Sequence, residues 1–308
     1  MSSASPLRMA HTGVMSARAI HLPRERLASF LRARVAGPDA AERAWRIWVA
    51  PGNRRFAPED VIWRVNLDPA MYPGGVCALF LQSLHPGPMA AVAQHDNYQS
   101  DPWGRLQRIS NHIAVTTYAP LPDVEAQFAL VRAVHERVRG TDEFGNPYWA
   151  GDPDLLRWVH DAETWSFLTA YQRWGRGRLS AVEADRYVAQ SAEGGAMLGA
   201  TGLPNSVDEL HAQLEAFRPS LACTPDALEV VDYLTHRAPL PAIARPGYRL
   251  VIEGGKALLP PWAREMLGLP GGRRAVALQG AAGRTATSLV GWALVGPDGE
   301  HDRPMAPN

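Results

Sequence analysis

The fold is decided by one stretch of the chain that also carries the main candidate for a functional side chain. This stretch covers residues 123–140 and reads DVEAQFALVRAVHERVRG. Four of its residues recur at helical spacing and share one stripe, namely Phe128, Val131, His135 and Val138. The pattern predicts a helix over residues 123–139 whose stripe faces the core. His135 then points inward, and Arg137 on the opposite side faces water.

Helical patterns separated by glycine and proline run along the chain from Gly74 onward, without a convincing stretch of alternating strand residues. We therefore expect an all-α fold. Ser180 and Ser206 each begin a Ser-x-x-Glu capping box, and Thr224 precedes a proline at a first helical position. Besides 123–139, helices are expected near residues 75–85, 87–96, 103–118, 153–173, 180–198, 206–216, 225–236, 246–258 and 261–268.

The domain organisation follows from what the sequence lacks, because it shows neither a fixed-period repeat nor a linker long enough to separate two domains. One helical domain over residues 59–270 is the simplest expectation. Residues 1–58 are expected to form an N-terminal extension, with short helices over 24–34 and 40–48. Residues 271–308 are expected to hold a last amphipathic helix, up to Leu294, and a flexible tail from Gly296.

The composition excludes several classes of protein. Hydrophobic residues make up 46% of the 308 residues, and 31 basic residues balance 31 acidic ones, which argues against disorder and against a nucleic-acid partner. The cysteines, Cys77 and Cys223, lack the spacing of a zinc or iron–sulfur site. The first forty residues contain no continuous apolar run, so no export signal or transmembrane span is visible. We expect a soluble cytoplasmic protein.

His135 admits two interpretations. A neutral imidazole on an apolar stripe is well suited to bind a metal, and Arg132 and Arg139 lie at the edge of the same stripe. An inward histidine bordered by two arginines would suit a planar, apolar, dianionic ligand such as haem. The alternative is a core histidine bonded to a backbone carbonyl, and periodicity does not decide between the two.

Other candidate residues flank this helix. His160 is predicted to point inward and to have a structural role, packed near the ligand or bonded to a neighbouring helix. His85, before Pro86, is predicted to make a helix-end bond or to line a pocket wall. Arg105 and Arg108 follow a helix start at Asp101 and could grip a propionate or line the oxygen side of a pocket. A solvated basic face explains the two arginines equally well.

Motifs of competing enzyme classes are missing from the sequence. There is no Gly-x-Ser-x-Gly elbow, no His-Glu-x-x-His, no Walker loop and no Gly-x-Gly-x-x-Gly after a strand. The Glu-x-x-His pairs of a di-iron helical bundle are missing too.

A series of motifs between residues 61 and 269 resembles the MpaB / rubber oxygenase (latex clearing protein) family. The first are Leu84-His85-Pro86, Asp101-Pro102 with Arg105 and Arg108, and Val131-Arg132-x-x-His135-x-x-Val138-Arg139-Gly140. Downstream follow Tyr148, Asp152-Pro153 with Leu155, Trp158-Val159-His160, Ala184-Asp185-Arg186-Tyr187 and Leu258-Leu259-Pro260-Pro261-Trp262. Their order and spacing carry the resemblance.

The resemblance implies a helical fold with a globin-related core that holds a b-type haem. It also implies an oxidoreductase that uses dioxygen to cleave carbon–carbon double bonds of isoprenoid chains. By position, His135 corresponds to the iron ligand and Arg132 to an arginine one turn before it. Arg105 and Arg108 correspond to basic residues on the distal side, where the catalytic groups are expected.

Two departures from the rubber-cleaving members shape the expected function. Where they carry a Lys-Thr pair on the distal side, this chain has Arg108-Ile109, and it shows no export signal. We therefore expect a haem b-dependent oxygenase that uses O2 or a peroxide on a small, apolar, isoprenoid or lipid-like intracellular molecule, by C=C cleavage or hydroxylation. The alternatives are a non-catalytic haem sensor or carrier and a cofactor-free helical binding module. The oligomeric state stays open.

Overall fold

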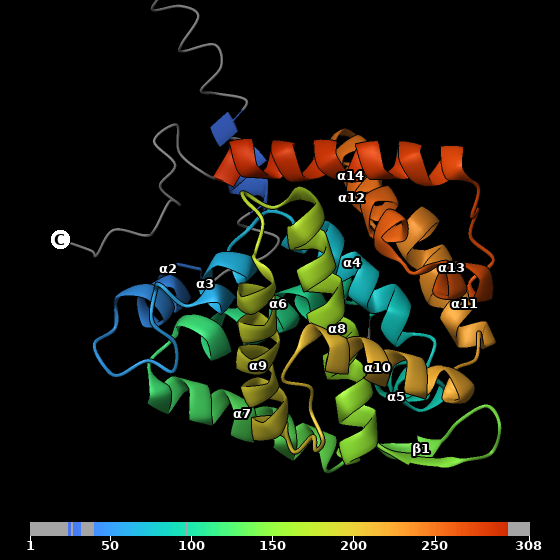
Figure 1. Ribbon diagram of the computed structural model, residues 1–308, viewed down its shortest axis with the longest axis horizontal. Helices are drawn as coiled ribbons and strands as arrows, with labels where there is room; N and C mark the ends of the chain where they lie inside the picture. Colours follow the sequence, from blue (N-terminus) through green and yellow to red (C-terminus); the bar gives the residue numbers. More distant parts are fainter. Residues whose placement is uncertain (1–23, 26, 32–39, 97, 295–308) are drawn as a thin grey trace, which may run out of the picture.

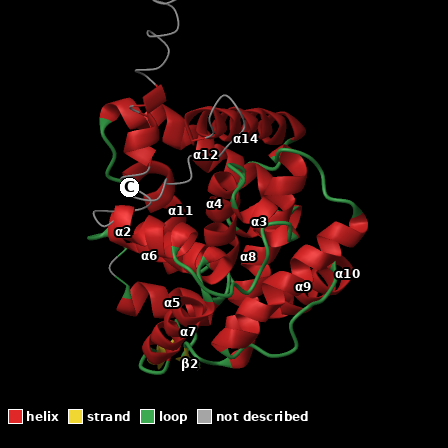
Figure 2. Cartoon of the chain, turned by 90° about the vertical axis from the view of Figure 1, so that its left-hand side faces the viewer, coloured by secondary structure: helices red, strands yellow, loops and turns green. Residues whose placement is uncertain are grey.

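The protein is built almost entirely from helices that pack around the central helix α8 (Pro153–Trp174) (Figure 1). This computed structural model describes residues 24–25, 27–31, 40–96 and 98–294. The expected all-α fold is confirmed. Seen from the side, the one described hairpin lies at the foot of the molecule beside α7 (Leu121–His135) (Figure 2).

The remaining elements follow in chain order. They are α2 (Ala40–Ala44), the π-helical turn η1 (Trp45–Val49), α3 (Val61–Asn66), α4 (Met71–Gln82), α5 (Pro86–His95), α6 (Pro102–Tyr118), β1 (Arg139–Thr141), β2 (Pro147–Trp149), α9 (Ala181–Leu198), α10 (Val207–Phe217), the 3-10 turn η2 (Arg218–Ser220), α11 (Pro225–Asp232), the π-helical turn η3 (Tyr233–Arg237), the 3-10 turn η4 (Ala242–Ala244), α12 (Arg245–Leu258), α13 (Pro261–Met266) and α14 (Arg273–Leu294).

Local capping explains where several helices begin. The Ser180 hydroxyl accepts from the Glu183 backbone N–H while the Glu183 carboxylate accepts from the Ser180 N–H, which completes the predicted capping box of α9. Thr224 and Asp101 cap α11 and α6, each followed by a proline at the first helical position. These helix starts were predicted from sequence and are confirmed.

Helix α8 is buried on two sides by two hydrophobic clusters. On one side Phe167 and Tyr171 pack with residues of α3, α6, α7 and α9. On the other side Trp158 and Ala170 pack with residues of α4, α10, α12 and α13. Trp165 lies against both clusters. A helix that is apolar on both flanks belongs in the interior, and the rest of the fold is arranged around it.

The helix that carries His135 is shorter than predicted. Helix α7 ends at His135, and Arg139 lies in strand β1, which pairs antiparallel with β2. The turn between the strands explains the difference. The Asp142 carboxylate accepts from the backbone N–H groups of Phe144 and Asn146, and Gly145 has a φ of 83°. This Asx-type turn fixes a hairpin that competes with further helix, and the expectation of a strand-free chain is wrong at this place.

The helices near both chain ends match the predictions where they are described. Residues 24–25 and 27–31 of the predicted helix 24–34 are helical, and residues 32–34 and the predicted tail from Gly296 lie outside the described residues. The predicted last helix is α14. It crosses the top of the molecule in Figure 1 and packs most extensively on α12, where Gly254 faces Gly283.

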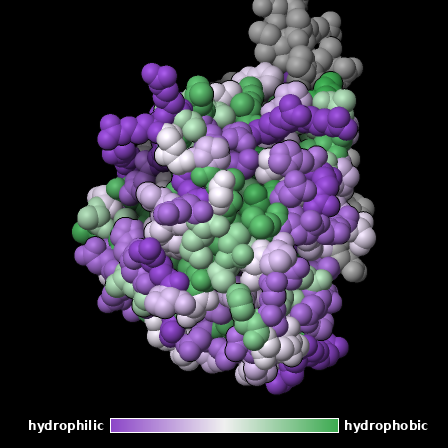
Figure 3. Space-filling view, turned by 90° about the vertical axis from the view of Figure 1, so that its right-hand side faces the viewer, coloured by the Kyte–Doolittle hydropathy of each residue, from purple (hydrophilic) through white to green (hydrophobic). Residues whose placement is uncertain are grey.

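No single described helix is long and apolar enough to cross a membrane. Helices α4 and α5 reach the length and apolar composition of a membrane span only when they are taken together, and the chain bends by 104° between them. Figure 3 shows the face at the right-hand side of Figure 1, on which apolar residues gather near the middle with polar residues around them. This face therefore carries an apolar patch within a polar surface.

We predict that Gly254→Ala lowers the free energy of unfolding by about 1–3 kcal/mol, the usual cost of overpacking. A Cβ atom at this position would lie 2.7 Å from the Gly283 Cα and 3.0 Å from the Pro73 Cβ. Urea unfolding measures the change. The matched control is Gly247→Ala in the same helix, where a Cβ would meet nothing within 4 Å. Equal stability of the two variants would show that α12 and α14 are not held at this contact.

Candidate functional site

The candidate site lies between helices α6 and α7, which run antiparallel from a corner at Ala119-Pro120. Within α6 only its last three residues are buried, and within α7 only Val124 and Phe128 are. Four large apolar side chains of the pair keep at least a third of their surface accessible, namely Leu106, Ile109, Leu130 and Val134. The described residues therefore leave much of the apolar surface of this pair uncovered.

The upstream segment 53–56 fixes the corner between the two helices. The Asn53 carbonyl accepts from the Leu121 N–H at 2.8 Å, and Arg54 forms an isolated antiparallel bridge with Pro120. The Arg54 guanidinium also donates to the carbonyls of Tyr118 and Ile47. This segment thus clamps the end of α6 to the start of α7.

His135 is the last residue of α7, and its side chain is half-buried. Its Nδ1 atom is buried without a hydrogen-bond partner among the described residues. Burial lowers the pKa of the imidazole, which keeps the ring neutral at neutral pH. The buried position of Nδ1 agrees with the predicted inward orientation of the His135 ring. A neutral imidazole with an unpaired buried nitrogen is the form of histidine that binds metals.

His112 on α6 is a second neutral imidazole of the site, and sequence reasoning missed it. Its ring packs edge to face against Phe128 at 5.5 Å, and its Nδ1 lies 3.4 Å from the Gln127 side-chain nitrogen. Burial lowers its pKa to about 4, and the nearby imidazole of His135 and the charge of Arg55 act in the same direction. A sequence signal existed, because His112 lies one turn after Arg108 and two turns after Arg105.

The two arginines predicted to be catalytic occupy different environments. Arg105 is mostly buried, lies 3.4 Å from the Asp96 carboxylate and stacks over Tyr98 at 5.7 Å. Burial lowers its pKa. Arg108 is 61% exposed and pairs with Asp101 at 3.3 Å, near the start of the same helix. Arg105 is therefore a partly desolvated cation, whereas Arg108 is solvated.

The arginines predicted to flank His135 are both exposed. The Arg132 guanidinium donates to the Met197 carbonyl on α9. Arg139 lies in the hairpin, 3.7 Å from the Glu136 carboxylate and 4.8 Å over the Trp149 ring. The prediction that Arg139 shares a helical stripe with His135 is wrong, because α7 ends before it.

His85 immediately precedes α5, and His160 lies on the central helix α8. His85 caps α5 and accepts from the Gly87 N–H at 3.3 Å, which is one of the two roles predicted for it, and its ring lies beside Trp158 and Phe217. The predicted helix 75–85 ends earlier, at Gln82. His160 lies 3.3 Å from the Thr164 hydroxyl, and burial lowers its pKa to about 4.

Glycine lets α9 approach His160 closely. A Cβ atom at Gly195 would lie 3.1 Å from the imidazole ring and 3.0 Å from Leu203. The inward orientation of His160 was predicted from periodicity, and the ring contacts a neighbouring helix as expected. The predicted role of His160 near the cofactor stays a prediction.

Two further ionisable side chains combine partial accessibility with strong desolvation. Tyr72 on α4 and Glu163 on α8 are only half-buried, yet burial raises their pKa values to about 12 and about 7. In both cases desolvation disfavours the charged form. Sequence reasoning identified neither residue.

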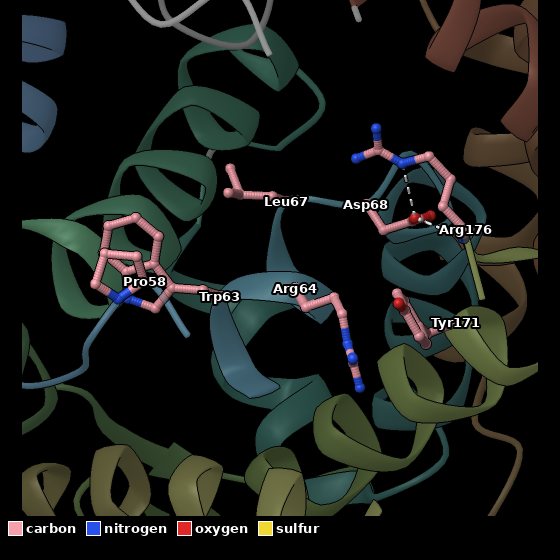
Figure 4. Close-up of a pocket in the computed structure, with 7 residues that line it drawn as sticks. All are labelled: Pro58, Trp63, Arg64, Leu67, Asp68, Tyr171 and Arg176. Carbon is pink, nitrogen blue, oxygen red and sulfur yellow. Dashed lines mark hydrogen bonds and ion pairs between the residues drawn. The ribbon is translucent and has the colours of Figure 1, made fainter. Parts of the chain in front are cut away.

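A separate cavity of about 250 Å³ lies at the ends of α3 and α8 (Figure 4). It is lined by Pro58, Trp63, Arg64, Leu67, Asp68, Tyr171 and Arg176. The Asp68 carboxylate accepts from the Arg176 backbone N–H at 2.9 Å, and Arg64 pairs with Glu183 at 2.6 Å. Charges around the cavity are thus compensated within the fold, and none of the predicted site residues lines it.

Comparison with protein families decides the class of the site. A family model described as "ER-bound oxygenase mpaB/B'/Rubber oxygenase, catalytic domain" matches residues 63–292. The chain belongs to this family. Because the match spans helices α4 to α13 and most of α3 and α14, the resemblance seen in the sequence is confirmed. Comparisons with curated proteins and with solved structures each gave no match.

Membership in the family makes this an oxygenase-type catalytic domain, hence an oxidoreductase that uses O2 and a small substrate. Arg54 and Arg55 precede the matched residues, although both contact helices of the site. Among the described residues, no group of three His, Cys, Asp or Glu side chains could hold a bare metal ion.

We predict that the imidazoles of His112 and His160 titrate with a pKa near 4, because burial disfavours their charged forms. In the unfolded chain they take up protons near pH 6.5. Their contribution to stability is therefore complete above about pH 6.5 and is lost as the pH falls toward about 4. NMR of histidine-labelled protein follows the two rings. Titration of either ring near pH 6.5 in the folded protein would contradict the burial described here.

Proposed function

We propose that the chain is a haem b-dependent oxygenase in which His135 binds the iron. The observation that carries the proposal is the buried, unpaired Nδ1 of a neutral imidazole at the end of α7, within a family of oxygenase domains. A haem supplies four nitrogen ligands of its own, so one histidine suffices to hold it. The donor set therefore fits haem better than it fits a bare metal ion.

Helices α6 and α7 would supply the residues that hold the haem, in the globin-related core that the resemblance implies. When bound, the haem supplies the redox chemistry that activates O2. Leu106 and Ile109 on α6 present accessible apolar surface to a substrate. This surface favours a small apolar molecule of the isoprenoid or lipid-like class. An apolar surface of this kind is compatible both with cleavage of a double bond and with hydroxylation of the substrate.

Arg105 is the better of the two predicted catalytic arginines. Its guanidinium is partly desolvated and is held by Asp96, so its charge acts through a medium of lower dielectric than the exposed Arg108. In this position it orients an oxygen-bearing group by hydrogen bonding. Arg132, Arg139, His85 and His160 are proposed to support the cofactor, and we place the protein in the cytoplasm.

The first test is the visible spectrum of purified, haem-reconstituted protein. We expect the wild type to show a Soret band and His135→Ala to lose most of it, because the only proposed axial ligand is gone. His236→Ala is the matched control, since His236 in η3 is exposed and pairs with Asp232 of α11. Full haem content and an unchanged spectrum in His135→Ala would refute the assignment, and His85 and His160 would be tested next.

The same preparations separate the alternative functions. A haem spectrum without oxygen consumption on any apolar substrate would indicate a sensor or carrier. A wild-type protein without a Soret band after reconstitution would indicate a cofactor-free binding module.

We predict that Arg105→Met slows oxygen uptake with squalene as an apolar probe by about 100-fold, the usual effect of removing one electrostatic donor. Arg108→Met is the matched control on the same helix and should change the rate little, because solvent screens its charge. An oxygen electrode measures both rates. A larger loss in Arg108→Met than in Arg105→Met would reverse the assignment.

A further inference from the structure

Arg55 is a buried cation whose hydrogen-bonding capacity the described residues do not satisfy. Its side chain is 11% exposed, and its Nε atom is buried without a hydrogen-bond partner. The nearest carboxylate oxygen, on Glu193, is 3.9 Å away, and Nη1 donates to the Met197 sulfur at 3.1 Å. A guanidinium has five N–H donors and a thioether is a weak acceptor. Burying a charge in this way is costly unless an anion pairs with it.

Glu193 is a poor partner for this charge. Its side chain is 53% exposed, and burial raises its pKa although the charge of Arg55 acts in the opposite direction. At 3.9 Å it does not form a hydrogen bond with Arg55. The arginine therefore keeps donor capacity for a ligand.

Arg55 lies inside the candidate site, where α6, α7 and α9 meet. Its guanidinium carbon is 4.4 Å from the Phe56 ring and 5.5 Å from the Phe128 ring on α7. Its charge also helps to lower the pKa of His112 on α6. On α9, a Cβ atom at Gly194 would come within 3.7 Å of Nη2, so glycine leaves space beside the guanidinium. Three helices of the site thus surround this cation.

Arg55 packs against α7 about two helical turns before His135, because its guanidinium lies over the Phe128 ring. Phe128 precedes His135 by seven residues on α7, which corresponds to about 10 Å along the helix axis. A haem held by its iron at His135 carries its two carboxylates at the rim of the macrocycle. An arginine beside Phe128 can meet such a rim group through a charge-assisted hydrogen bond.

We propose that Arg55 binds one propionate of the haem, and this inference rests on the proposed function. Arg55 precedes the family-matched residues 63–292, so the anchor is supplied by the upstream segment that also clamps the corner of α6 and α7. Arg132 and Arg139, the arginines first expected near the cofactor, are exposed and already have partners. Arg55 is the flanking arginine whose burial calls for an anion.

The test compares haem b with haem dimethyl ester, in which both propionates are esterified and uncharged. Wild type, Arg55→Met and Arg55→Lys are reconstituted with each porphyrin, and haem loss to excess apomyoglobin is followed at the Soret band. We expect Arg55→Met to lose haem b about 10–100-fold faster than wild type, since a charged hydrogen bond contributes about 1.5–3 kcal/mol. With the dimethyl ester, the two proteins should release the porphyrin at similar rates.

Arg55→Lys keeps the charge and should lose haem b more slowly than Arg55→Met. Arg46→Met is the matched control, because Arg46 lies nearby in sequence but is exposed and pairs with Asp123. It should release both porphyrins as the wild type does.

Equal acceleration for the two porphyrins would overturn the proposal, because it would assign Arg55 a purely structural role. Unchanged release of haem b from Arg55→Met would overturn it as well. Either of these results could occur together with loss of haem from His135→Ala. The proposed function would then stand, and only the role of Arg55 as a propionate ligand would be wrong. A wild-type chain that takes up neither porphyrin would overturn both.

Discussion

The burial of α8 on two opposite sides is the constraint on which the rest of the structure depends. One side packs against α4, α10, α12 and α13, and the other against α3, α6, α7 and α9. The first side forms a closed hydrophobic cluster that includes the fully buried Trp158. The second side is closed near Phe167 and Tyr171, but α6 and α7 become progressively less buried away from their common corner. The well-packed side of α8 thus stabilises a fold whose other side, around α6 and α7, is packed incompletely.

This division matches the chemistry proposed for the molecule. A site for an apolar ligand needs accessible apolar surface together with a few polar groups whose hydrogen bonds are not satisfied by the fold. The pair of helices α6 and α7, with Arg55 beside it, supplies both: accessible apolar side chains, and the unpaired nitrogens of His135 and Arg55. By contrast, the cavity near Asp68 has its charges paired internally, and this balance leaves it less suited to bind a charged ligand.

Local signals made much of the fold predictable from sequence. Helical periodicity and the caps at Ser180, Thr224 and Asp101 act over a few residues, and the helices they predicted are present. The end of α7 was misplaced because the apolar stripe continues through Val138, whereas the Asp142 turn imposes a hairpin. His135 could be found by its periodicity and its motif. Arg55 could not, because its burial results from contacts with helices more than 70 residues away along the chain.

The clamp formed by residues 53–56 has a consequence for how this domain can be varied. The corner at Ala119-Pro120 sets how α6 and α7 are placed relative to each other, and the bridge between Arg54 and Pro120 holds this corner. The anchoring residues precede the segment that matches the family. Changes in this short upstream stretch are therefore expected to shift α6 against α7 while every residue of the matched domain stays the same.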